Sequence, residues 1–306
     1  MKKAIIIIAT VFIAFLANAQ EINMSQYSFN GFNWNAGYAG STNYIRFAAS
    51  YRQRVNSSAG KVNTAVFSAD MPLQNKNMGL GFQAATEQIG VNKTTAFYAS
   101  YAYQVRFNKN TALGLGMKAG VSNYSADFDQ LLVWDAGDEH FTNNNKNQMI
   151  PQVGLGAYLH GKNFYAGVSM PTVYAYDANK NDATQAKPWN NKNILFSSAY
   201  VINLSKDINI KPAVFGNYST SNKTLTADVN MTLGYKNIVA VTMGYRSNNA
   251  TTAMVEVRPL SSLRIAYAYE LTSANNMKAF GGNTHEILLG YDLMAKNSKY
   301  LSNRYF

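Results

Sequence analysis

The sequence predicts an all-β protein, a transmembrane antiparallel β-barrel of about 14 strands preceded by a cleaved signal peptide. Three observations predict this fold class. The N-terminus has the features of an export signal, the rest of the chain alternates between apolar and polar residues, and glycine and aromatic residues are abundant although only 14% of residues are charged. No segment after the signal contains eighteen apolar residues in a row, which excludes a membrane protein built from helices.

Residues 1–19 have the composition of a secretory signal peptide. Lys2 and Lys3 precede an apolar run of thirteen residues, and Ala17-Asn18-Ala19 then forms a cleavage site. A transmembrane anchor is the alternative, but this run is shorter than the ~20 residues that a helix needs to cross a bilayer. We therefore expect cleavage after Ala19.

Alternation between apolar and polar residues is clearest over residues 111–124. Leu115 and Met117 share one phase, and Gly116 and Lys118 share the other. In a membrane barrel one phase faces lipid and the other faces a polar lumen. Lys118 is expected to face the lumen, because a lysine that faces lipid at mid-membrane costs ~2–4 kcal/mol. The same period recurs at residues 97–107, 225–233 and 263–271.

The full pattern predicts fourteen strands and places both chain ends in the periplasm, because the number is even. Their expected bounds are 43–53, 61–71, 77–87, 93–107, 111–124, 149–160, 162–172, 192–204, 208–219, 223–235, 237–247, 250–258, 261–271 and 283–292. The barrel domain is therefore expected over residues 43–292. Six alternate connections are brief, which is typical of periplasmic turns, and the long connections 125–148, 173–191 and 272–282 are expected outside the cell.

Two segments flank the predicted barrel. Residues 20–42 are rich in Asn, Gly and aromatic residues without a regular period, and they predict a periplasmic or lumen-plugging arm. Residues 293–306 predict a periplasmic tail that ends in the aromatic pair Tyr305 and Phe306. A terminal aromatic residue is expected of barrels that the outer-membrane assembly machinery inserts.

Charge and cysteine content limit the possible functions. The formal net charge is +11, but the Lys and Arg residues are scattered singly along the chain. Proteins that bind nucleic acids gather basic residues on one face, so no nucleic-acid partner is predicted. Cysteine is absent, which excludes a lipoprotein anchor, disulfides and thiolate metal sites.

One acidic loop is a candidate metal site. Asp135, Asp138 and Glu139, within residues 135–140, carry oxygen atoms of the kind that bind calcium. Their spacing is not that of a calcium-binding loop. We interpret them as solvated loop acids, with a weak surface calcium site as the alternative.

The three histidines are the candidates for catalysis. His140 and His160 have no Ser or Asp at a fixed spacing, and His285 stands next to Glu286 in the last predicted strand. His285 and Glu286 are interpreted as a lumen pair that satisfies its own hydrogen bonds, with a catalytic dyad as the alternative. We predict no enzymatic activity, no cofactor and no metal.

Charged residues fall repeatedly in the predicted lumen phase. Because buried charges need partners, a cross-lumen network that narrows or closes the channel is expected, whereas an open porin would leave these charges in water. The residues are Arg46, Arg52, Arg106, Lys118, Asp228, Arg246, Glu256, Arg264, Glu270 and Glu286.

Aromatic residues recur at the predicted strand ends, as expected of the girdles at the two membrane interfaces. A platform for stacking carbohydrate is the alternative. The residues are Tyr44, Tyr51, Phe107, Tyr124, Tyr235, Tyr245 and Tyr291.

Motifs near both ends of the chain resemble the PorP/SprF family of type IX secretion system membrane proteins. That family shows patterns close to S-Q-Y-x-F-N-P and N-P-A-Y-A-G before its first strand, and ends in S-P-R-Y-F. The matching segments here are Ser25-Gln26-Tyr27, Phe29-Asn30, Asn35, Tyr38-Ala39-Gly40, Tyr51-Arg52-Gln53, His285-Glu286-Ile287 and Ser302-Asn303-Arg304-Tyr305-Phe306. The departures are Gly31, Ala36 and Gly37, where the family usually has prolines and alanine, and Arg54, where tryptophan is common.

This resemblance implies a non-enzymatic component in the outer membrane of a Bacteroidetes-type cell. It implies that the protein binds and anchors a secreted surface protein, such as a gliding adhesin, through the C-terminal sorting domain of that protein. Other type IX secretion components, the lipid bilayer and lipopolysaccharide are the further partners. The residues expected to bind partners are Ser25, Gln26, Tyr27, Phe29, Asn30, Tyr38, Gly40, Tyr51, Arg52, Arg304, Tyr305 and Phe306. The alternative function is an outer-membrane porin or selective channel.

Overall fold

The computed structural model describes Tyr27 and residues 29–55, 62–73, 77–126, 146–175, 193–247, 249–272 and 283–293. The predicted signal peptide, the predicted tail after residue 293 and the acidic residues at 135–140 lie outside these residues. Two short 3₁₀ turns, η1 (Gly31–Asn33) and η2 (Ala36–Tyr38), precede the strands. The strands are β1 (Ile45–Val55), β2 (Val62–Pro72), β3 (Met78–Ile89), β4 (Asn92–Arg106), β5 (Ala112–Ala126), β6 (Lys146–His160), β7 (Phe164–Ala175), β8 (Asn193–Tyr200), β9 (Ile202–Asn203), β10 (Ile208–Ser219), β11 (Thr224–Tyr235), β12 (Val239–Arg246), β13 (Ala250–Leu260), β14 (Leu263–Thr272) and β15 (Asn283–Leu293).

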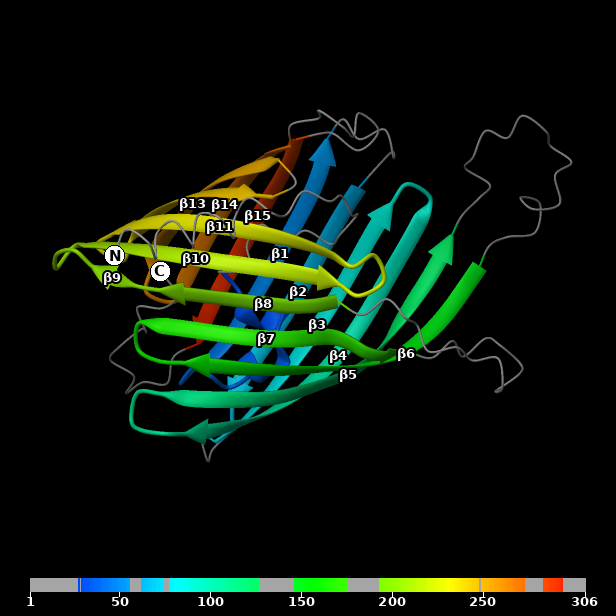
Figure 1. The fold of residues 1–306 in the computed structure, drawn as a ribbon, viewed down its shortest axis with the longest axis horizontal. Helices are drawn as coiled ribbons and strands as arrows, with labels where there is room; N and C mark the ends of the chain where they lie inside the picture. Colours follow the sequence, from blue (N-terminus) through cyan, green and yellow to red (C-terminus); the bar gives the residue numbers. More distant parts are fainter. Residues whose placement is uncertain are drawn as a thin grey trace, which may run out of the picture.

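The strands form a closed antiparallel barrel (Figure 1). Consecutive strands pair with each other, and β15 pairs with β1 to close the sheet. Val201 separates β8 from β9, and both of these strands pair with β10, so together they fill one position in the barrel. The predicted fourteen-strand barrel is therefore confirmed, and no predicted strand end is displaced by more than three residues.

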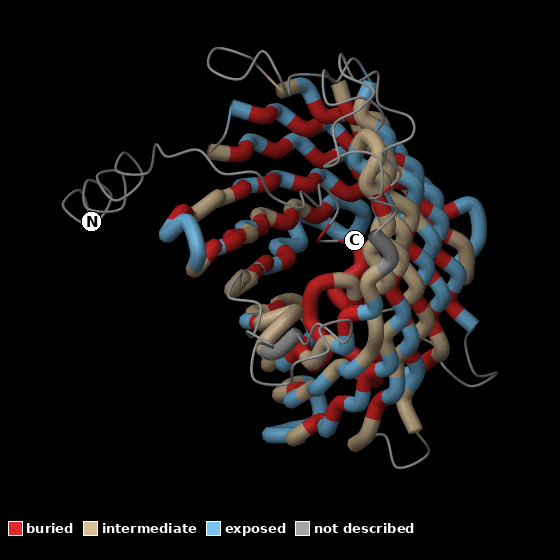
Figure 2. The backbone as a smooth tube through the Cα atoms, turned by 90° about the vertical axis from the view of Figure 1, so that its right-hand side faces the viewer, coloured by how far each residue is buried: buried red, intermediate tan, exposed pale blue. Residues whose placement is uncertain are grey.

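Burial alternates along the strands because one face turns outward and the other faces the lumen (Figure 2). On β5, Leu115 and Met117 are about half exposed, whereas Gly114 is buried. Lys118 has the phase of Gly114 and faces the lumen as predicted, with its ammonium group 4.3 Å from the ring centre of Tyr98. A helix long and apolar enough to cross a membrane is not found among the described residues.

The two rims of the barrel differ in their connections. Ile45 pairs with Leu293, so the barrel begins and ends at the same rim. The short connections 73–77, 107–111, 161–163, 204–207, 236–238 and 261–262 lie at this rim, which we call the turn rim. The long connections 127–145, 176–192 and 273–282 leave from the opposite rim, which we call the loop rim.

One seam of the barrel is irregular. The pairing of β6 with β7 shifts register between Val153 and Leu155, where β7 has two extra residues around Pro171. Proline has no N–H to give to a ladder, so it is tolerated at such a bulge. Only six residue pairs then join β7 to β8, starting at the turn rim.

Candidate functional site: the occupied lumen

Residues before β1 lie inside the barrel. We call Tyr27 and residues 29–42 the arm; it is dark blue in Figure 1 and lies within the ring of strands in Figure 2. Its aromatic residues are almost completely buried, with Tyr27, Phe29 and Tyr38 each 1% exposed. The arm therefore occupies the lumen in the manner of a plug.

Two asparagines give the arm its local shape. Asn30 precedes η1, and its side chain accepts a hydrogen bond from the Phe32 amide at 3.1 Å. Asn35 precedes η2, and its side chain accepts from the Gly37 amide at 2.8 Å. Both asparagines satisfy amide groups that a helical turn leaves free at its start, so each 3₁₀ turn begins where the sequence places an Asn.

Glycines on the lumen face let the arm approach the wall closely. A Cβ atom added at Gly116 would overlap the Ala36 carbonyl group, and one added at Gly114 would overlap the Gly37 oxygen. The wall glycines that meet the arm are Gly79 and Gly81 on β3, Gly114 and Gly116 on β5, Gly156 on β6 and Gly167 on β7. We call these wall glycines the glycine wall. Gly40, on the arm itself, has φ +70, a conformation that favours glycine.

Side-chain amides fix the arm to β4, β6 and β7. The Asn35 amide nitrogen donates to the backbone oxygens of Ala157 at 2.9 Å and Val168 at 3.2 Å. The Gln104 amide nitrogen donates to the oxygens of Gly37 at 3.1 Å and Ala39 at 2.8 Å. An arm side chain thus donates to carbonyl groups of the wall, and a wall side chain donates to carbonyl groups of the arm.

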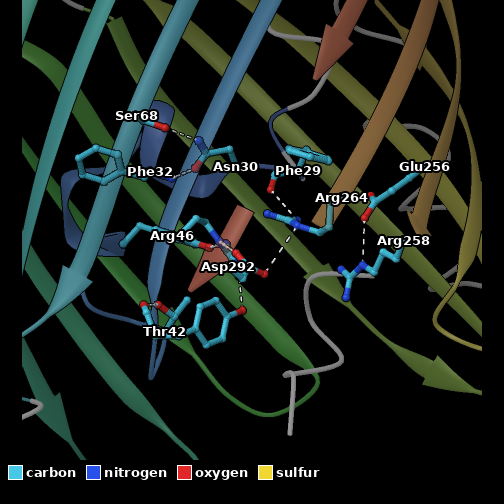
Figure 3. Close-up of polar contacts among 12 residues, drawn as sticks. Phe29, Asn30, Phe32, Thr42, Arg46, Ser68, Glu256, Arg258, Arg264 and Asp292 are labelled. Atoms are coloured by element: carbon cyan, nitrogen blue, oxygen red, sulfur yellow. Dashed lines mark hydrogen bonds and ion pairs between the residues drawn. The ribbon is translucent and has the colours of Figure 1, made fainter. Parts of the chain in front are cut away.

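Charged residues from β1, β14 and β15 hold the arm near the turn rim (Figure 3). The Arg46 Nε atom lies 3.0 Å from Asp292 Oδ1, and the same guanidinium donates to the hydroxyls of Tyr38 and Tyr44. Arg264 lies 3.9 Å from the second oxygen of Asp292, and its guanidinium is 4.3 Å from the ring centre of Phe29. Glu256 and Arg258 form a further pair at 3.4 Å. We call these charged residues the turn-rim network.

A second group of charges lies nearer the loop rim. Arg246 is 2.9 Å from both Asp228 and Glu270, and Arg52 is 3.1 Å from Glu270. Tyr27 stands next to this group, which we call the loop-rim network. Burial, and secondarily the Asp228 carboxylate, raise the pKa of the Tyr27 phenol well above its usual range, so its hydroxyl remains a neutral donor.

Most of the predicted lumen charges do form ion pairs, but along one side of the barrel and not across the lumen, because every pair joins residues of β1 and β11–β15. Arg46, Arg52, Asp228, Arg246, Glu256, Arg264 and Glu270 form ion pairs inside the barrel. Arg106 is a correction, because it lies exposed at the end of β4 and donates to Asn77 at 3.0 Å. Sequence reasoning missed Asp292 and Arg258, although both follow the lumen phase of their strands.

The interpretation of His285 and Glu286 as a pair is wrong. Adjacent residues of a strand face opposite sides, so Glu286 is buried in the lumen while His285 faces outward. His285 Nδ1 lies 2.7 Å from the Tyr267 hydroxyl, and its ring packs against Tyr269 at 5.2 Å. His160, in contrast, contacts Gln104 at 3.1 Å and so supports the arm. The described residues contain no group of three His, Asp or Glu that could hold a metal ion.

The predicted aromatic girdle needs two corrections. Tyr51, Phe107, Tyr235, Tyr245 and Tyr291 are exposed on the outer surface as expected. Tyr44 is instead buried in the lumen beside Arg46. Tyr124 follows the lumen phase of β5, and its hydroxyl donates to Asn92 at 2.6 Å.

The residues predicted to bind partners fall into three groups. Tyr27, Phe29, Asn30, Tyr38 and Gly40 come together in the buried arm. Arg52 belongs to the loop-rim network, and Tyr51 is exposed on the outer surface. Ser25, Gln26, Arg304, Tyr305 and Phe306 lie outside the described residues. Partner binding by these residues stays a prediction.

Residues 16–291 match the family described as type IX secretion system membrane protein PorP/SprF. The chain belongs to the PorP/SprF family. The resemblance seen in the end motifs is thereby confirmed. No curated protein matches the sequence significantly.

Solved structures show what this PorP/SprF chain resembles in fold. The CymD monoaromatic hydrocarbon channel has a TM-score of 0.51 at 9% identity, covering 92% of this chain and 95% of that one. A Pseudomonas aeruginosa FadL homologue has a TM-score of 0.45 at 11% identity, covering 90% and 95%. The Acinetobacter baumannii outer membrane protein Omp33 has a TM-score of 0.45 at 9% identity, covering 82% and 99%. At such identities the likeness to CymD indicates the barrel fold alone.

Proposed function

We propose that this PorP/SprF protein is a non-enzymatic component of the outer membrane that anchors a secreted surface protein through the C-terminal sorting domain of that protein. Family membership supports a role in type IX secretion. The occupied lumen favours an anchor over a channel. The arm is buried there between the glycine wall and the charged networks.

The packing of the lumen disfavours free diffusion of solutes. A porin needs a continuous path of water through the barrel, and its lumen charges stay hydrated. Here the arm backbone contacts the glycine wall. The arginines of both networks form buried ion pairs with carboxylates at 2.9–3.9 Å. A barrel with this interior serves better as a rigid support than as a pore.

The proposal assigns different roles to the two rims. The long connections of the loop rim hold the client on the cell surface, and the turn rim with both chain ends faces the periplasm and other secretion components. Loops are the usual place for binding residues on a rigid scaffold. A tag at Asn144 should then be accessible on intact cells, and one placed after Phe306 should be hidden.

Gene deletion tests the proposal directly. Surface proteomics of the deletion strain should show one large protein lost from the cell surface, and the wild-type gene should restore it. Liposomes that carry the purified barrel should take up small sugars little faster than empty liposomes. Persistence of every surface protein together with rapid sugar uptake would show that the porin alternative is right.

A further inference from the structure

The turn rim carries exposed lysines on four neighbouring turns. These turns lie at one end of the barrel (Figure 1), and each contains a single lysine. The lysines are Lys109, Lys162, Lys206 and Lys236. Among the described residues of the six turns at this rim, Asp207 is the one acidic residue. The described part of the turn rim is therefore basic.

Two short connections of the loop rim differ from these turns. Residues 90–91 join β3 to β4, and residues 220–223 join β10 to β11. Lys223 is the one charged residue in these two connections. Short connections in this barrel are thus not basic in general, and the excess of lysines is a property of the turn rim.

Lys109 lies just past the end of the apolar outer surface. The outward-facing side chains from Phe97 to Phe107 include Tyr101 and Tyr103, and all four of these aromatic residues are exposed. The strand from Phe97 to Phe107 spans about 25 Å across the membrane when it is tilted, which is the height of the apolar band of a membrane barrel. Lys109 follows two residues after Phe107, so its side chain starts at the level of the lipid headgroups.

Large apolar side chains accompany two other lysines. Leu204 is 60% exposed and lies two residues before Lys206. Ile238 is 50% exposed and lies two residues after Lys236, whose ammonium is 5.2 Å from the ring centre of the exposed Tyr235. Apolar and basic side chains combine in this way at a bilayer surface, because the apolar groups enter the hydrocarbon boundary and the ammonium groups reach the headgroups.

We propose that the four lysines of the turn rim bind the phosphate groups of anionic phospholipids in the leaflet around this rim. Charge complementarity and the apolar neighbours of the lysines favour lipid as the occupant. A lipid leaflet contacts all four turns at once, whereas an acidic protein would have to match their spacing along a curved rim. Each basic residue near an anionic membrane surface strengthens association about fivefold. The lipid preference does not depend on the proposed function, and only the assignment of this leaflet to the periplasmic side rests on it.

Spin-labelled lipids measure this preference on the folded barrel. The purified protein is placed in phosphatidylcholine vesicles, and electron paramagnetic resonance gives the association of labelled phosphatidylglycerol relative to labelled phosphatidylcholine. The wild type should prefer phosphatidylglycerol several-fold at low salt. About 1 M NaCl should remove most of this preference, because salt screens charges that are exposed to water.

Substitutions assign the preference to the turn rim. The fourfold variant should lose it, and its changes are Lys109→Gln, Lys162→Gln, Lys206→Gln and Lys236→Gln. Arginine at the same four positions should retain it, because the charge is kept. A matched pair of double variants then compares the rims: Lys206→Gln with Lys236→Gln should lower the preference several-fold.

The control for that pair is Lys93→Gln with Lys223→Gln, which removes two exposed lysines at the loop-rim ends of strands and should leave most of the preference. Heat-modifiability on gels checks that each variant is folded.

Several results would overturn the proposal. No preference in the wild type would show that the lysines serve another partner, such as an acidic protein. An unchanged preference in the folded fourfold variant, or an equal loss in both double variants, would show that the turn rim is not the lipid site. Loss of the preference on addition of inorganic phosphate at constant ionic strength would show a discrete phosphate site and not a lipid surface. None of these results depends on whether the protein anchors a client, so failure here leaves the anchor function standing.

Discussion

On one side of the lumen, β3, β5, β6 and β7 present glycine to the arm, whereas on the other side β1 and β10–β15 present charged side chains. On the glycine wall the backbones of arm and strand touch, and amide side chains such as Gln104 bond to arm carbonyls. On the charged wall, which is formed by the turn-rim and loop-rim networks, long side chains pair mainly with each other, and Arg46 and Arg264 also contact Tyr38 and Phe29 of the arm. Close backbone packing holds the arm on one side, and charged side chains hold it on the other.

The difference predicts which kind of substitution destabilises each wall. Added volume has nowhere to go on the glycine wall, because interiors are close-packed and backbone cannot move aside as a side chain can. Loss of a group is the damaging change on the charged wall, because it leaves an opposite charge buried without a partner. The two walls should therefore respond in opposite ways to enlarging and truncating substitutions.

The largest effect is expected at the turn-rim network. Arg46→Met removes the nearer partner of Asp292, which is 1% exposed, and leaves only Arg264 at 3.9 Å. Breaking a buried ion pair on one side costs ~3–5 kcal/mol. Urea unfolding of the barrel in lipid vesicles should show a lower free energy of unfolding by this amount.

The double variant Arg46→Met with Asp292→Leu is the matched control. Replacement of both members of a buried pair by apolar residues is often neutral. Because Arg264 also loses its carboxylate at 3.9 Å, the double variant should regain only part of the lost stability. A double variant no more stable than Arg46→Met would contradict the role of an unpaired Asp292 charge.

Enlargement of the glycine wall should have the next largest effect. Gly116→Val places atoms where the Ala36 carbonyl lies, and overpacking of this kind costs about 1–3 kcal/mol. We expect the arm to leave the wall, so added protease should cleave before β1 much faster in the folded barrel. Ala119→Val faces outward on the same strand and should leave the arm protected. Equal protection in both variants would contradict the role of the glycine wall.

The sequence predicted the barrel better than its interior. A period of two is a local property, so the strands and the facing of Lys118 could be predicted from neighbouring residues alone. The meeting of Gly116 with Ala36 could not, because it joins segments about 80 residues apart and glycine in a strand has several possible meanings. Tyr44 was misplaced for a different reason: it lies just before β1 and shares the lumen phase of Arg46, so the period of two already places it inside the barrel.

His285 teaches a different lesson about local patterns. Its neighbour Glu286 suggested a pair, yet the period of two that predicted the strands forbids two adjacent residues from sharing a face. Arg106 had the correct phase and the wrong depth, because phase gives the facing of a residue but not its distance from the rim. The error at His285 came from adjacency in the sequence. The error at Arg106 came from leaving out its depth along the barrel.

A smaller effect is expected from Asn35→Ala. This change removes the cap of η2 and two hydrogen bonds to β6 and β7, but it leaves no charge behind. Loss of a cap costs about 1 kcal/mol, and neutral hydrogen bonds add a similar amount. We expect moderately faster proteolysis of the arm than in the wild type. Asn35→Ser keeps a capping oxygen without adding charge and loses the donors to β6 and β7, so the two variants separate the contributions.

The smallest effect is expected from Arg106→Met. This variant tests whether an arginine in the lumen phase stabilises the barrel because it is buried or because it is charged. Arg106 is exposed at the turn rim, where it donates to the Asn77 side chain. Water can solvate both groups when the bond is lost, so Arg106→Met should change the free energy of unfolding by less than about 0.5 kcal/mol. The measurement is the same urea titration as for Arg46→Met. A loss comparable to that of Arg46→Met would show that arginines contribute to this barrel independently of burial, and the contrast between the two walls would then not follow from desolvation.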